Sequence, residues 1–137
     1  INYWKRFKEN DNMDLSDFET KVAYSTCVTA MNMEADAIVC YTNSGNSARK
    51  LAGLGAGCPI LAITDNRKTF NQLALAWNVT PVFVEKTENI DTTLENGIKK
   101  LQDKGILEKG DTIVISGGPS ILANAEESKV VASVAKI

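Results

Sequence analysis

The sequence predicts an α/β fold in which a mostly parallel sheet of five strands lies between helices. Short apolar runs of strand length alternate with longer segments of helical periodicity, the pattern of parallel strands joined by helices. The run 59–64 is continuously apolar, as expected of a strand buried on both faces. The last run, 129–136, follows a break without helical pattern, so we expect it to return antiparallel at the sheet edge.

Length and composition limit the class of protein. A chain of 137 residues forms one domain with its own core. The net charge is −2 and there is no dense basic patch, so we expect no nucleic-acid partner. No apolar run approaches the roughly 20 residues that span a bilayer, so we expect no membrane partner. Three cysteines without CxxC spacing are expected to be reduced core residues of a cytosolic protein: Cys27, Cys40 and Cys58.

The beginning of the chain is polar and charged, with a small aromatic cluster. We expect residues 1–13 to be a connector from a preceding domain, and residues 14–137 to be the domain itself. The chain starts at Ile1 rather than at Met, which favours a piece of a longer protein. The first helix of the domain is expected to begin at Asp14 or Ser16 and to run to about residue 33, with Glu19 completing a capping box.

The remaining elements follow in alternation. Strands are expected at 37–41, 59–64, 81–84, 112–116 and 129–136, and a short helix at 47–54. A second helix, capped by Asp65 or Asn66, is indicated by an apolar stripe at helical spacing that places Trp77 in the core: Phe70, Leu73, Ala74 and Trp77. A third opens at Asn89 or Asp91 and closes at Gly105, with one apolar side: Ile90, Leu94, Ile98 and Leu101.

The most informative stretch is the polar turn after the first strand. It consists of six small residues: Thr42, Asn43, Ser44, Gly45, Asn46 and Ser47. A strand that enters a helix through such a turn directs free backbone N–H groups and short side chains at one spot, which suits an anion such as phosphate. The alternative is that Ser44, Asn46 and Ser47 only close the turn and cap the helix. Both interpretations remain open at this point.

Two further polar segments are expected beside this turn. The Thr64–Asn66 turn and the Ser116–Ser120 loop also follow strands, and ligands of such sheets bind beyond the carboxyl ends of the strands. The first turn is not a Walker A loop, because no Gly-Lys-Ser/Thr follows it, and with one glycine it is not a dinucleotide fingerprint. Three polar loops at one edge predict a ligand.

No catalytic set is expected. Histidine is absent, which removes the commonest general base and histidine-based metal sites. Asp65 is expected to cap a helix, and Cys40 to pack inside its strand. Four basic side chains are expected on solvated helix faces: Arg49, Lys50, Arg67 and Lys68. We therefore predict binding, with no catalytic and no metal-binding residues.

Several segments resemble a known family in order and spacing. They are Tyr24–Asn32, Ala37–Val39, Thr42–Arg49, Cys58–Thr64 and Gln72–Val82. Together they are similar to the C-terminal (allosteric or regulatory) domain of pyruvate kinase, over about residues 14–116. The resemblance implies a three-layer α/β/α fold with a mixed five-stranded sheet whose last strand is antiparallel.

The resemblance also implies a function. Pyruvate kinase is a glycolytic transferase that moves phosphate from phosphoenolpyruvate to ADP, using magnesium and usually potassium, in a barrel domain that this chain lacks. The chain alone is therefore expected to be non-catalytic and without a cofactor. In the family, the loop matching Thr42–Ser47 holds a sugar-phosphate effector in many members, and the C-terminal domain supplies an interface of a homotetramer.

Some residues depart from the family pattern. Glu126 and Glu127, after the fourth strand, would repel a second phosphate, and the Lys86–Asn89 loop shows no clear clamp for one. The segment Leu51–Gly57 lacks the basic residues common in relatives. A monophosphate, a nucleotide and no effector at all therefore stay open, and the alternative function is a purely structural assembly domain.

Overall fold

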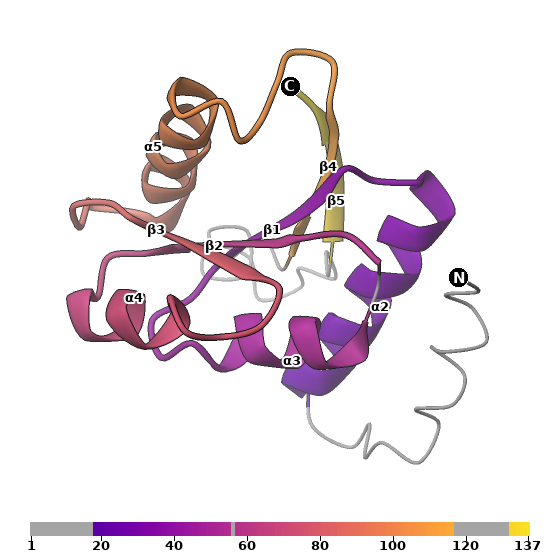
Figure 1. The fold of residues 1–137 in the computed structure, drawn as a ribbon, viewed down its shortest axis with the longest axis horizontal. Helices are drawn as coiled ribbons and strands as arrows, with labels where there is room; N and C mark the ends of the chain where they lie inside the picture. Colours follow the sequence, from indigo (N-terminus) through magenta and orange to yellow (C-terminus); the bar gives the residue numbers. More distant parts are fainter. Residues whose placement is uncertain (1–17, 56, 117–131) are drawn as a thin grey trace.

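The computed structural model describes residues 18–55, 57–116 and 132–137, and helices and strands alternate along them (Figure 1). The helices are α2 (Phe18–Met33), α3 (Asn46–Leu54), α4 (Arg67–Leu73) and α5 (Ile90–Asp103). The strands are β1 (Ala37–Tyr41), β2 (Ile60–Thr64), β3 (Val79–Phe83), β4 (Thr112–Ser116) and β5 (Ala132–Lys136). The predicted α/β class is confirmed. The predicted connector 1–13 and the cap at Asp14 or Ser16 lie outside the described residues.

The strands form one five-stranded sheet in the order β3-β2-β1-β4-β5. Strands β1 to β4 are parallel, and Ile38 of β1 lies opposite Ile60 of β2 on one side and Val114 of β4 on the other. Strand β5 pairs antiparallel with β4, so the predicted antiparallel last strand is confirmed. Its described part begins at residue 132, three residues after the predicted start at 129.

Helices cover both faces of the sheet. Helices α2, α3 and α4 lie on one face and α5 lies on the other (Figure 1). Parallel strands need crossover connections, and these are almost always right-handed. The chain moves from β1 to β2 to β3 in one direction, which puts α3 and α4 on the same face, and it then returns past β1 to β4, which puts α5 on the opposite face. The three predicted layers result.

Asparagine side chains begin two of the helices. Asn66 accepts the Thr69 N–H at 3.2 Å and starts α4, and Asn89 accepts the Thr92 N–H at 2.8 Å and starts α5. Asp65, the other predicted cap of α4, has a different contact, described below. At the other end of α3, Gly55 has φ 68, the left-handed conformation that commonly ends helices.

The predicted core position of Trp77 is wrong. Helix α4 ends at Leu73, so the apolar stripe loses its helical geometry one turn before Trp77. Residues 74–78 form a turn, Asn78 adopts φ 59, and β3 begins at Val79, two residues before its predicted start at 81. Leu73 is fully buried, whereas Trp77 is 72% exposed.

Helix α5 approaches the sheet closely at Gly97. A Cβ atom at this glycine would lie 2.5 Å from Cδ1 of Ile63, a fully buried side chain of β2. A contact this short cannot exist, so the absence of a side chain at Gly97 sets the distance between α5 and β2. Gly53 in α3, in contrast, has open space where its Cβ would be.

We predict that Gly97→Ala lowers the free energy of unfolding by about 1–3 kcal/mol, because the added methyl group overpacks the interface with Ile63. Gly53→Ala is the matched control, since the same methyl group meets no neighbour and a helical alanine is favoured, so we expect no loss and a gain of up to about 1 kcal/mol. Urea denaturation followed by circular dichroism measures both. Equal stability of the two variants would contradict the close approach of α5.

Candidate functional site

The polar turn that the sequence singles out lies at the centre of the sheet. It connects β1 to α3, and β1 is the middle strand, with β2 on one side and β4 on the other (Figure 1). From β1 the chain first continues to β2 and later returns to β4, so the strand order reverses at β1. In open parallel sheets, ligands bind at this reversal, in the crevice beyond the carboxyl ends of the strands.

The interior of the turn is closed by its own residues. Thr42 is buried, and its hydroxyl accepts the Gly45 N–H at 2.8 Å. Gly45 has φ 92, a conformation that L side chains rarely adopt, and it is the residue that precedes the first turn of α3. Thr42 and Gly45 therefore shape the turn, and their side-chain and backbone groups are used inside it.

Residues at the start of α4, after the Thr64–Asn66 turn, form hydrogen bonds to the Thr42–Ser47 turn. The Thr69 hydroxyl in α4 donates to the Asn43 carbonyl at 2.5 Å, and the Asn66 amide donates to Asn43 Oδ1 at 3.5 Å. The backbone around Asn43 is thus tied to the start of α4. The predicted meeting of the Thr42–Ser47 and Thr64–Asn66 turns at one edge is observed.

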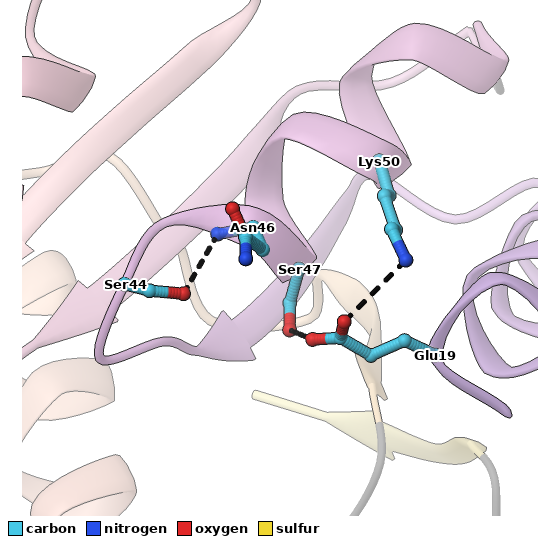
Figure 2. A network of polar contacts seen from close by, with 5 residues as sticks. All are labelled: Glu19, Ser44, Asn46, Ser47 and Lys50. Carbon is cyan, nitrogen blue, oxygen red and sulfur yellow. Dashed lines mark hydrogen bonds and ion pairs between the residues drawn. The ribbon is translucent and has the colours of Figure 1, made fainter. Parts of the chain in front are cut away.

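Three side chains of the site are exposed or half-buried, and Figure 2 shows two of them, Ser44 and Ser47. The Ser44 hydroxyl accepts the Asn46 N–H at 3.3 Å, so it satisfies one of the free N–H groups at the start of α3. The Ser47 hydroxyl does not cap the helix but donates to Glu19 Oε1 at 3.3 Å. The exposed Arg49 side chain bends back over Gly45, where its Nη1 donates to the Ser44 carbonyl at 3.3 Å. A guanidinium group therefore lies against the turn.

The residue pattern does not predict the position of Glu19 at this site. Glu19 was expected in a capping box with Ser16, which lies outside the described residues. Instead its carboxylate crosses from α2 to α3, where it accepts from Ser47 and pairs with Lys50 Nζ at 3.4 Å (Figure 2). The opposite charges of Glu19 and Lys50 are the sequence feature that could have suggested an ion pair, but only the packing of α2 beside α3 brings the two side chains together.

Asp65 and Arg67 also differ from their predicted roles. Asp65 is not the cap of α4: its carboxylate accepts the Tyr41 hydroxyl at 3.0 Å. Burial, the hydrogen bond to Asp65 and the charge of Asp65 raise the pKa of Tyr41 to about 12, so its hydroxyl stays protonated and donates at neutral pH. The Arg67 guanidinium, expected in solvent, lies 3.8 Å from the centroid of the Phe83 ring, a cation–π contact.

The β4 side of this sheet edge is described only in part. Ser116 ends β4 beside β1, and its hydroxyl accepts from the Thr26 hydroxyl of α2 at 3.2 Å. Residues 117–131, which include Glu126 and Glu127, lie outside the described residues. The predicted role of the Ser116–Ser120 loop is therefore not tested beyond Ser116.

The described residues offer no reactive thiol. Burial raises the pKa of Cys27 and of Cys40 to about 12 and that of Cys58 to about 11, so all three thiols stay protonated at neutral pH. Among residues 18–55, 57–116 and 132–137, no group of three or more cysteine, aspartate or glutamate side chains could hold a metal ion. No helix in the same ranges is long and apolar enough to cross a membrane.

The fold defines an α/β domain with a polar turn at the strand-order reversal. Residues 20–130 match the family model described as "Pyruvate kinase, alpha/beta domain". This match spans more than half of the chain, and the chain belongs to the pyruvate kinase alpha/beta domain family. The resemblance noted in the sequence is thereby confirmed.

Named relatives and solved structures agree with this family. The chain is 29% identical over 118 residues to a pyruvate kinase of Clostridium acetobutylicum, covering 86% of this chain and 25% of the relative. It is 31% identical over 105 residues to one of Thermotoga maritima, covering 77% of this chain and 22% of the relative. A crystal structure of pyruvate kinase from Cryptosporidium parvum matches with a TM-score of 0.81 at 17% identity, covering 99% of this chain and 26% of that chain. The chain thus spans about a quarter of the relatives that it matches.

We predict that Thr42→Val lowers the free energy of unfolding by about 1–3 kcal/mol, because it leaves the Gly45 N–H inside the turn without its acceptor. Thr42→Ser is the matched control, since it keeps the hydroxyl. Thermal unfolding of both variants measures the difference. A valine variant as stable as the serine variant would show that this hydrogen bond does not hold the turn together.

Proposed function

We propose that this chain is the regulatory and oligomerisation domain of a pyruvate kinase, and that the Thr42–Ser47 turn binds a phosphorylated small molecule. The observation that carries the proposal is the position of this turn at the strand-order reversal, where α3 begins. Helix N-termini favour anions because their first N–H groups lack intrahelical partners and the helix dipole is positive there.

The groups around the turn suit a phosphate. Ser44 and Ser47 carry exposed or half-exposed hydroxyls at the start of α3, and both can donate to phosphate oxygens. Arg49 supplies a guanidinium at the turn, within hydrogen-bond distance of the Ser44 carbonyl. Thr42 and Asn43 contribute differently: their contacts hold the turn in shape, and a preformed site loses less entropy on binding.

The rest of the proposal concerns the whole protein. We propose that a barrel domain preceding this one transfers phosphate from phosphoenolpyruvate to ADP with magnesium and potassium, as part of glycolysis in the cytoplasm. The present domain then contributes regulation and one interface of a homotetramer. Family membership and the coverage of about a quarter of each relative support this division of roles.

A second function is favoured by a specific contact. The Ser44 hydroxyl already accepts the Asn46 N–H, a contact that closes the turn and satisfies one N–H at the start of α3. If closing the turn is its only role, the domain serves assembly alone and has no effector. The two functions differ in whether loss of the serine hydroxyls affects ligand binding as well as stability.

We predict that millimolar fructose 1,6-bisphosphate, glucose 6-phosphate, ribose 5-phosphate or AMP raises the melting temperature of the chain, since a ligand of the folded state adds RT ln(1 + [L]/Kd) to its stability. The double variant Ser44→Ala/Ser47→Ala should lose this shift. Differential scanning fluorimetry measures both effects.

The matched control is Asn89→Ala, which removes the cap of α5 at a cost of about 1 kcal/mol and leaves the Thr42–Ser47 turn intact. It should lose stability and keep the ligand-induced shift. If none of the four ligands shifts the original chain, or if the double variant keeps the full shift, the effector site at this turn is refuted and assembly is the better account.

A further inference from the structure

An acidic side chain of a neighbouring helix occupies part of the proposed site. Glu19 belongs to the first turn of α2 as described, and its two carboxylate oxygens reach two different groups of α3 (Figure 2). Oε1 accepts from the Ser47 hydroxyl at 3.3 Å, and Oε2 lies 3.4 Å from Lys50 Nζ. A carboxylate is thus held at the start of a helix, where negative charge is favoured.

The groups that hold Glu19 are those that an incoming anion would use. The Ser47 hydroxyl has one proton, and Glu19 receives it. Lys50 supplies the ammonium group on the same side of α3, and Glu19 neutralises it. We propose that Glu19 acts as an internal competitor of the phosphorylated ligand and lowers the affinity of the Thr42–Ser47 turn for it. This inference rests on the proposed function of that turn.

The contact is weak enough to exchange. The Lys50 side chain is 34% exposed and that of Glu19 is 51% exposed, and ion pairs at such positions are screened by water and contribute little to stability. A phosphate, with nearly two negative charges at neutral pH, is a stronger partner for the same donors. It would also repel the Glu19 carboxylate across a few ångströms. Binding therefore requires the carboxylate to turn away from Ser47.

The exchange would alter the junction of two helices. Glu19 is part of α2 and Ser47 and Lys50 are part of α3, and these helices pack side by side on one face of the sheet (Figure 1). When the phosphate replaces the carboxylate, α2 and α3 lose this polar contact and keep their buried apolar packing. Ligand binding at the turn is thereby linked to the position of the Glu19 side chain on α2.

The test compares Glu19→Gln with a variant of equal charge change elsewhere. Glutamine keeps the size of the side chain and removes its charge, so the Kd for fructose 1,6-bisphosphate should fall at least about fivefold, as expected when a unit charge a few ångströms from a phosphate is removed. Glu95→Gln, at an exposed position of α5 on the opposite face of the sheet, is the control and should leave Kd unchanged. Isothermal titration calorimetry on the 137-residue chain measures each value.

The outcomes separate this inference from the function on which it rests. Tighter binding by Glu19→Gln alone supports the internal competitor. Equal or weaker binding by Glu19→Gln, or the same gain in Glu95→Gln, overturns it and leaves the phosphate site standing. If neither the original chain nor Glu19→Gln binds fructose 1,6-bisphosphate, inorganic phosphate or AMP, the proposed function itself fails and the inference fails with it.

Discussion

The architecture depends on burying the central strand β1 between two parallel neighbours. Residues 37–40 are buried, and hydrogen-bonded pairing on both sides leaves β1 no free edge. Parallel neighbours require right-handed crossovers, which fix α3 and α4 on one face and α5 on the other. The same topology puts the end of β1 at the strand-order reversal, so the packing of the core and the position of the proposed ligand site have one cause.

The strands and the layers could be predicted from the sequence, whereas two features that depend on a helix end and on a contact between helices could not. The apolar runs of β1, β2 and β4 follow from residue pattern, and capping chemistry narrows the starts of α4 and α5 to two residues each, of which Asn66 and Asn89 are the caps. The predicted burial of Trp77 is wrong because hydrophobic periodicity does not show that α4 ends at Leu73. The contacts of Glu19 could not be predicted because its partners, Ser47 and Lys50, lie 28 and 31 positions away in the sequence. Only the packing of α2 beside α3 brings them close.

In the polar turn, some residues hold the backbone in shape and others offer polar groups at the surface, and the sequence alone does not tell them apart. Hydrogen bonds of Thr42 and Asn43 hold the backbone of the turn in shape. The polar groups of Ser47 and Arg49 lie nearer the surface, where they contact Glu19 and the Ser44 carbonyl. The six residues 42–47 are all small and mostly polar, yet in the structure some of them hold the turn in shape and others contact neighbouring helices. The fold itself is shared with a solved pyruvate kinase at 17% identity, with a TM-score of 0.81.

The proposed regulatory role depends on anion binding at the start of α3. The most direct measurement is an amide ¹H–¹⁵N spectrum of the labelled chain during titration with fructose 1,6-bisphosphate. We expect the largest saturable shifts on the N–H groups of residues 44–48, with smaller shifts at Glu19. Saturable shifts confined to another surface, or no shift at millimolar ligand, would contradict this expectation.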